Sequence, residues 1–144
     1  STYPSKASEY GPSLRRLLEY GSEKATALEY AGLERARERF RHELDSVLSS
    51  VDVVLSPCMP TCPPRVDSMG QDAGDGGDAA PMLTFTAPFD YSGHPTLTLP
   101  LDLNASGLPR SFQFIGSRLG ERRLIEIGLV IEAAIGFDQH PDLD

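Results

Sequence analysis

One histidine in this 144-residue sequence is the side chain best suited to acid–base chemistry. His94 lies between Gly93 and Pro95, four residues after Asp90. A Ser/His/Asp hydrolase needs a serine on a sharp turn such as G-x-S-x-G, and the sequence contains no such motif. The phosphate-binding pattern G-x4-G-K is also absent. The histidine and the aspartate are therefore compatible with a pocket or with a simple turn, and the residues assemble no complete catalytic set.

The spacing of the cysteines and of the aspartate-rich run does not match known metal-binding motifs. Cys58 and Cys62 are separated by three residues, whereas a zinc site needs two further ligands and a thioredoxin-type site needs C-x2-C. Asp72, Asp75 and Asp78 lie in a glycine-rich run without the closing glutamate of an EF-hand loop. We therefore expect neither a metal nor a cofactor.

Composition excludes several classes of protein. The net charge of −8 disfavours binding to nucleic-acid phosphates. The longest apolar runs have about four residues, too few to cross a bilayer, and no apolar segment follows a basic start, so we expect a cytoplasmic protein. The length suits one domain, without a separate second one, although Ser1 in place of Met indicates processing, cleavage or a longer parent.

The first part of the chain predicts two helices. Residues 1–12 predict an irregular lead-in, rich in proline, glycine and serine. Leucines at one-turn spacing predict a short helix from Ser13 to Gly21, because glycine is favoured just past a helix end. A long helix is expected from Ser22, as its N-cap, to Ser50, with an apolar stripe and a solvated face that carries its arginines and glutamates.

The second half of the chain predicts strands and one helix. Residues 52–57 are expected to form a strand buried on both faces, followed by an irregular proline-rich segment over 58–64 and a mobile loop over 67–81. Strands over 96–103 and 111–116 are expected to pair as a hairpin, with Pro100 at an edge or a bulge. A helix over 121–134 and a polar surface tail over 136–144 complete a mixed α/β unit.

An ordered set of short motifs resembles the C-terminal third of amidase-signature enzymes. Tyr30-Ala31 and Arg37 on the long helix precede the strand motif DVVLSPCMP at 52–60. The motif FTAPFDYSGHPT at 85–96, LTLP at 97–100 and LPRSFQFIG at 108–116 follow in the order typical of that family. Each motif is weakly specific, but their order and spacing together indicate this family.

The resemblance implies a larger α/β/α fold with a mixed central sheet, of which this chain is the C-terminal portion. It also implies hydrolysis of carboxylic amides by a Ser–cis-Ser–Lys triad, whose residues belong to an upstream region of the family pattern. The only lysines here are Lys6 and Lys24, and no Gly-Gly-Ser-Ser-Gly-type stretch is present. We therefore assign no catalytic residue to this chain and expect it to be inactive alone.

The resemblance also suggests site residues and partners. Leu83 stands where the glutamine-using members of the family, which belong to tRNA amidotransferases, carry an aspartate, and this difference disfavours a glutamine-dependent enzyme. The loop around residues 89–94 approaches the acyl pocket in this family, so Phe89, Asp90, Tyr91 and His94 are the predicted substrate-binding residues. The expected partners are a small-molecule amide and the N-terminal part of the same enzyme, which carries the triad.

Two alternatives remain open from the sequence. The chain is compatible with a stand-alone, non-catalytic interaction domain that has an amidase-like fold. It is also compatible with one half of a two-chain enzyme, in which a separate polypeptide supplies the triad.

Overall fold

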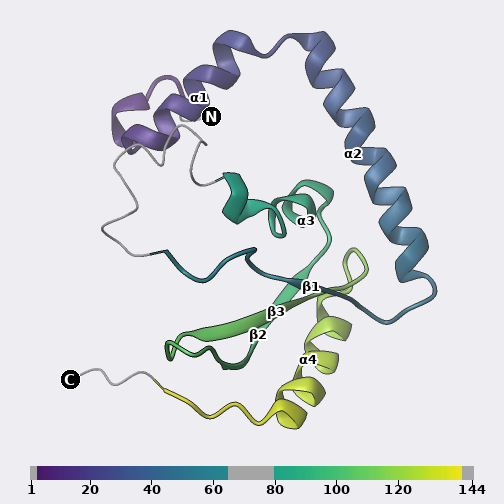
Figure 1. The fold of residues 1–144 in the computed structure, drawn as a ribbon. Helices are drawn as coiled ribbons and strands as arrows, with labels where there is room; N and C mark the ends of the chain where they lie inside the picture. Colours follow the sequence, from purple (N-terminus) through teal and green to yellow (C-terminus); the bar gives the residue numbers. More distant parts are fainter. Residues whose placement is uncertain (1–2, 65–79, 141–144) are drawn as a thin grey trace.

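The computed structural model describes residues 3–64 and 80–140, and Figure 1 shows a small sheet with helices on both sides. Most of the predicted 67–81 loop, residues 67–79, lies outside the described residues, as do the last four residues of the predicted tail. The elements, in chain order, are η1 (Ala7–Glu9), α1 (Pro12–Lys24), α2 (Ala27–Leu48), β1 (Val54–Pro57), η4 (Ala80–Leu83), α3 (Ala87–Ser92), β2 (Thr96–Leu103), β3 (Pro109–Ile115) and α4 (Glu121–Ile135).

The predicted hairpin is confirmed as part of a three-stranded antiparallel sheet with the order β1-β3-β2. Its turn is stabilised by the side-chain oxygen of Asn104, which accepts the backbone N–H groups of Ser106 and Leu108 at 2.8 and 3.0 Å. β2 is an edge strand, and its register shifts between Pro100 and Asp102. Pro100 therefore lies in an edge strand, next to an irregularity in the strand register, as expected for a residue without a backbone N–H.

Alternation along β3 divides the hydrophobic core between the two faces of the sheet. Phe112 and Phe114 belong to a cluster with Leu124 of α4. Ile115, which is fully buried, belongs to a second cluster with Leu44 of α2 and with α3. Successive strand side chains point to opposite faces, so this single central strand supports α4 on one side and α2 with α3 on the other, as Figure 1 shows.

The last helix packs closely on the sheet because it carries a glycine at the contact. The predicted helix over 121–134 is confirmed as α4, with Leu124 and Gly128 buried. A Cβ atom added at Gly128 would overlap Cδ2 of Leu97 in β2. A side chain at residue 128 would therefore force the Leu97 side chain to move.

The boundary between the first two helices differs from the prediction. Gly21 and Ser22 lie inside α1, and the hydroxyl of Ser22 donates to the carbonyl of Glu19. The N-cap of α2 is Thr26, which forms a capping box with Glu29: the Thr26 hydroxyl accepts the Glu29 N–H at 3.2 Å, and the Glu29 carboxylate accepts the Thr26 N–H at 2.9 Å. This reciprocal arrangement satisfies two backbone donors, whereas a lone serine cap satisfies one.

The long helix buries residues only in the second half of the predicted apolar stripe, which runs from Leu28 to Val51. Leu44 and Leu48 are buried, but Leu28 and Leu33 of the same apolar stripe are 77% and 59% exposed. Arg37 and Arg41, expected on a solvated face, are instead partly buried. Only the C-terminal half of α2 reaches the sheet, and α3 packs along its side. The amphipathic pattern therefore identified the buried residues near the end of the helix but not the exposure of its first half.

The first strand is also less covered than predicted. Leu55 is 56% exposed, although Val53 and Val54 pack against the two core clusters. β1 lies at the edge of the described sheet and has only four residues. The apolar run at 53–55 therefore does not mark a strand covered on both faces by the described part of the chain.

Candidate functional site

The predicted site residues lie on and just after α3, a helix that was not predicted from the sequence. Pro88 occupies the first turn of α3, where its missing N–H has no cost. Gly93 ends the helix with a left-handed conformation, φ 75°, and its N–H donates to the carbonyl of Phe89 at 2.8 Å. The A-P-F-D-Y-S-G segment therefore folds as a single short helix with a proline start and a glycine stop.

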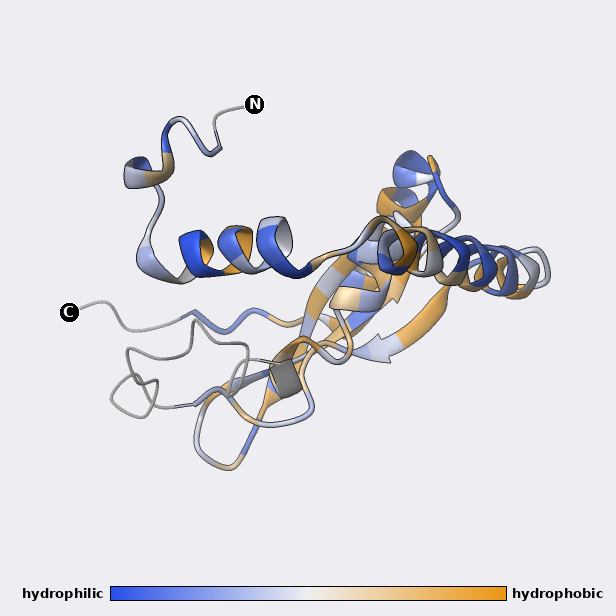
Figure 2. Ribbon diagram, turned by 90° about the horizontal axis from the view of Figure 1, so that it is seen from above, coloured by the Kyte–Doolittle hydropathy of each residue, from blue (hydrophilic) through white to orange (hydrophobic). Residues whose placement is uncertain are grey.

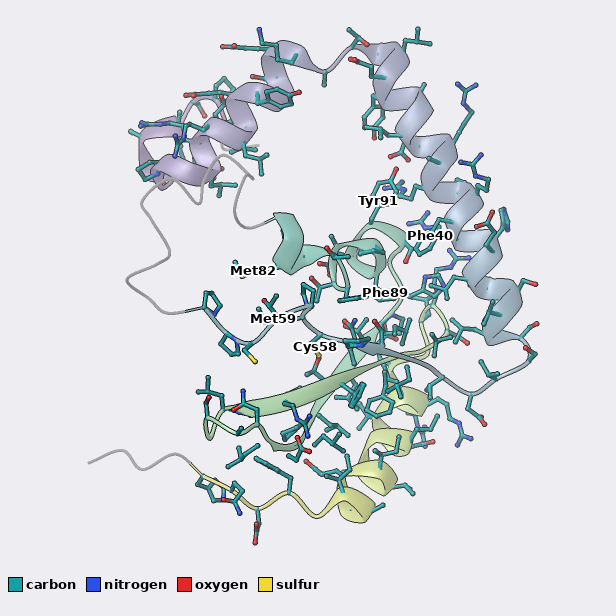
Figure 3. The ribbon with its side chains drawn as sticks, viewed as in Figure 1. Phe40, Cys58, Met59, Met82, Phe89 and Tyr91 are labelled. Atoms are coloured by element: carbon teal, nitrogen blue, oxygen red, sulfur yellow. The ribbon has the colours of Figure 1, made fainter. Side chains whose placement is uncertain are left out.

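The four predicted site residues have different environments. Phe89 is partly buried and packs against the cluster that contains Ile115. Asp90 and Tyr91 are exposed, whereas His94 is 5% exposed. Figure 3 shows Phe89 and Tyr91 of α3 lying with Phe40 between α3 and α2. The structure thus brings the four residues together on one segment, with two of them accessible.

His94 pairs with a residue that the sequence motifs did not indicate. Its Nε2 lies 3.1 Å from Oδ1 of Asp45 on α2, and its Nδ1 lies 2.9 Å from Oγ of Ser92. The same Asp45 accepts a hydrogen bond from Arg118 at 3.0 Å. Asp90, the expected neighbour of His94, is exposed on α3. A carboxylate 49 residues upstream is therefore the partner of the histidine.

The Asp45, His94 and Ser92 side chains are arranged like a catalytic triad but cannot act as one. A nucleophile must reach a substrate carbonyl, and Ser92 is 0% exposed. Its hydroxyl also lies 3.2 Å from the carbonyl of Phe89. The Ser92 hydroxyl and both ring nitrogens of His94 therefore have hydrogen-bond partners within the protein, as suits a structural role.

Four positions on α2, spaced by four residues, contact the segment 91–94. We call Leu33, Arg37, Arg41 and Asp45 the α2 stripe. The Tyr91 hydroxyl donates to the Leu33 carbonyl, and the Arg37 guanidinium lies 6.0 Å from the centre of the Tyr91 ring. Arg41 Nε donates to the Ser92 carbonyl at 2.6 Å. A spacing of four residues keeps these groups on one side of a helix, facing α3.

Arg118 lowers the pKa of the shared carboxylate of Asp45. Its hydrogen bond is the main cause that holds the pKa of Asp45 below the usual range, and the hydrogen bond from His94 acts in the same direction. Partial burial opposes both effects. Asp45 is therefore ionised at neutral pH and holds two basic side chains from different loops.

Four residues of this network, Asp45, Ser92, Arg41 and Arg118, were not predicted from the sequence. The available signal was the four-residue spacing of Arg37, Arg41 and Asp45, which places these polar residues beside the buried Leu44 and Leu48. Polar residues at this spacing next to an apolar stripe indicate a helix face that packs against polar groups. Their charge favoured a solvated interpretation instead.

The described residues contain no group of three or more His, Cys, Asp or Glu side chains that could hold a metal ion. Cys58 lies 3.6 Å from the Thr98 hydroxyl, and Cys62 accepts from the Asn104 amide at 3.4 Å. The aspartates at 72, 75 and 78 lie outside the described residues. Among the described helices, none has the length and apolar character required to cross a membrane.

The fold and the comparisons agree on the class of protein. A mixed α/β unit with helices on both faces of its sheet is shared with solved amidase-type structures, and the amidase family model matches residues 2–125. The chain therefore belongs to the amidase family.

The relatives include amidases and tRNA amidotransferase components. A putative amidase AmiD of Mycobacterium tuberculosis is 35% identical over 136 residues, which cover 94% of this chain and 28% of that protein. A glutamyl-tRNA(Gln) amidotransferase component of Rhizorhabdus wittichii is 28% identical, with the same coverage. The chain thus spans about 28% of the length of these relatives.

Two solved structures resemble the fold. A crystal structure of an amidase superposes with a TM-score of 0.68 at 26% identity, covering 90% of this chain and 30% of that one. A glutamyl-tRNA(Gln) amidotransferase component of Thermotoga maritima superposes with a TM-score of 0.59 at 22% identity, covering 94% of this chain and 30% of that one. The second match supports the fold alone.

Proposed function

We propose that this chain is the C-terminal portion of an amidase that hydrolyses carboxylic amides, with its Ser–cis-Ser–Lys triad outside residues 1–144. The observation that carries this proposal is the family match over residues 2–125, together with coverage of only 28% of the relatives. On this proposal the isolated chain does not hydrolyse amides.

The positions of the lysines support the placement of the triad outside this chain. Lys6 is exposed and pairs with Glu9 at 3.1 Å, and Lys24 is exposed in the last turn of α1. A lysine that activates a serine must lie within hydrogen-bond reach of it in a protected site. The surroundings of Lys6 and Lys24 do not provide such a site.

Exposed apolar surface supports a larger assembly. Leu28, Tyr30 and Leu33 of α2 are exposed, and so are Ile125, Leu129 and Val130 on the outer side of α4. A helix that is apolar on its outer side as well as its inner side is typical of the interior of a larger protein. The two edge strands, β1 and β2, also present unpaired backbone groups among the described residues. The N-terminal part of the same enzyme is the proposed partner for these surfaces.

Residues 89–94 are the proposed contribution of this chain to the amide pocket. Asp90 and Tyr91 have the exposure that contact with a substrate requires. Phe89 and His94 face the core of the described structure, so their contribution is expected to come through the shape of the segment.

The test is an amide-hydrolysis assay with benzamide as the probe and ammonia release as the signal. The purified 144-residue chain is assayed alone and after co-expression with an upstream segment that carries the lysine and the Gly/Ser-rich signature. We expect no turnover from the chain alone and turnover from the pair.

Turnover by the chain alone would contradict the proposed location of the triad. A folded chain that stays inactive with every such upstream segment would favour the non-catalytic interaction domain. Turnover that requires an upstream segment encoded as a separate polypeptide would indicate the two-chain form of the enzyme.

A further inference from the structure

The segment that carries the proposed pocket residues has little intrinsic stability. α3 has only six residues, and helices this short do not persist in water by themselves. Its position must therefore come from contacts with neighbouring elements. Phe89 supplies one apolar contact, through the cluster with Leu44 and Ile115.

Arg41 supplies a charged contact at the C-terminal end of α3. Its Nε donates to the carbonyl of Ser92 at 2.6 Å, and its Nη1 pairs with Glu38 at 2.6 Å. The last carbonyls of a helix have no partner within the helix and carry its partial negative charge. A guanidinium at this position both satisfies such a carbonyl and fixes the end of α3 to α2.

Asp45 joins three separate parts of the chain. It belongs to α2, it binds His94 in the connection between α3 and β2, and it binds Arg118 in the connection between β3 and α4. Ser92 faces the other nitrogen of the His94 ring, so the ring is held from both sides. Removal of Asp45 would leave the 5%-exposed histidine without one partner and Arg118 without its carboxylate.

We propose that Arg41, Asp45 and His94 are positioning residues that hold residues 89–94 against α2, so that Asp90 and Tyr91 are presented at a fixed place. This inference rests on the proposed function only in the assignment of residues 89–94 to the amide pocket. We call the contacts of Arg41, Asp45 and His94 the clamp. The clamp is a property of this chain and does not depend on amide hydrolysis.

The experiment is hydrogen–deuterium exchange of the full 144-residue chain, followed by mass spectrometry of peptides that cover residues 87–95 and 109–115. The variants are Asp45→Ala, Asp45→Asn and Arg41→Met. Arg39→Met is the matched control, because Arg39 is exposed on the same helix. The β3 peptide reports global opening, and its exchange is used to separate local opening from loss of the whole fold.

We expect Asp45→Ala and Arg41→Met to speed exchange in residues 87–95 by about tenfold or more relative to the β3 peptide, since each removes a hydrogen bond to a charged group. Asp45→Asn is expected to restore part of the protection, because an amide oxygen still accepts a hydrogen bond. Arg39→Met is expected to leave both peptides unchanged.

Equal acceleration in both peptides for all three variants would overturn the proposal, because the residues would then support the whole fold and not this segment. Unchanged exchange in residues 87–95 would overturn it as well. Neither result depends on turnover, so failure of the clamp is distinguishable from failure of the proposed amidase function.

Discussion

At the scale of single residues, one partly buried polar network links His94, Asp45 and Arg118. His94 has partners for both ring nitrogens, and Asp45 is shared between that histidine and Arg118. Such a network stabilises a folded protein only while its charged member stays ionised. Its dependence on pH is therefore open to measurement.

Asp45 is expected to contribute stability that is lost in acid. Its pKa is lowered in the folded chain, so the unfolded chain takes up its proton at a higher pH than the folded chain does. The contribution is complete above the ordinary aspartate pKa of about 3.9 and disappears as the pH falls through the lower folded value. Urea unfolding between pH 5 and about 2.5 measures it.

Asp45→Asn should flatten the loss of stability below about pH 4. Asp52→Asn is the matched control, because the Asp52 side chain is an exposed member of a surface pair with Arg123. An Asp45→Asn protein whose acid profile equals that of the unaltered chain would contradict the assigned role of Arg118 and His94.

Gly93→Ala is expected to destabilise the chain by about 1–2 kcal/mol, because residue 93 adopts φ 75° and an L side chain is strained there. Gly21→Ala is the matched control, and its expected effect on stability has the opposite sign. Gly21 lies inside α1, so alanine should stabilise that helix by about 0.5–1 kcal/mol. Thermal unfolding followed by circular dichroism measures both effects. Destabilisation by Gly21→Ala would contradict the position of Gly21 inside α1 and favour a helix that ends at residue 21, as the sequence predicted.

At the scale of elements, two local devices determine where the helices begin and how closely they pack. The capping box of Thr26 and Glu29 sets the start of α2, and Gly128 leaves room for the Leu97 side chain between α4 and β2. Each makes a separate prediction.

Thr26→Ala is expected to cost about 1 kcal/mol through the lost N-cap. Ser22→Ala should change stability much less, because the Ser22 hydroxyl bonds to a carbonyl inside α1. The two free energies of unfolding, from urea titration, decide between Thr26 and Ser22 as the residue that starts the second helix.

Gly128 and Leu97 are expected to be coupled. Alanine at residue 128 gains helix propensity of about 1 kcal/mol but forces the Leu97 side chain to move. Gly128→Ala should therefore be more favourable in a Leu97→Ala background than in the unaltered chain, by about 1 kcal/mol or more. A double-mutant cycle of unfolding free energies measures the difference, and full additivity would contradict the close approach.

At the scale of the whole molecule, the chain leaves apolar helix faces uncovered. Figure 2 shows hydrophobic positions along α1 among hydrophilic ones, and Leu14 and Leu17 of this helix are exposed. Leu28 and Leu33 of α2 are exposed, and α4 exposes Leu129 and Val130. Exposed apolar patches of this kind mark interaction surfaces or promote association.

The 144-residue chain is therefore expected to self-associate when it is purified alone. Leu28→Glu combined with Leu33→Glu should shift it toward the monomer without loss of stability, because both side chains are exposed. Arg35→Glu with Arg39→Glu, on the exposed charged side of α2, is the control. Light scattering coupled to gel filtration measures the mass, and a monomer in the unaltered chain would contradict the expectation.

Elements with strong local signals were predictable from the sequence. The alternation of Leu97, Leu99 and Leu101 and the turn residues after Asn104 predicted the hairpin, since both depend on neighbouring residues. In the same way, the helical spacing of apolar residues over 121–134 predicted α4. The start of α2 was mispredicted because Ser22 and Thr26 are both acceptable caps, and α1 continued through Gly21.

An ordered set of short motifs was enough to indicate the family, and it made residues 89–94 the predicted pocket segment. The pairing of His94 with Asp45, and of Arg41 with the end of α3, could be known only from the folded chain. These pairs join residues 49 and 51 positions apart, so no local spacing encodes them. They form because α2 and α3 pack on the same face of the sheet, where a buried polar group must find its partner in whatever element lies against it.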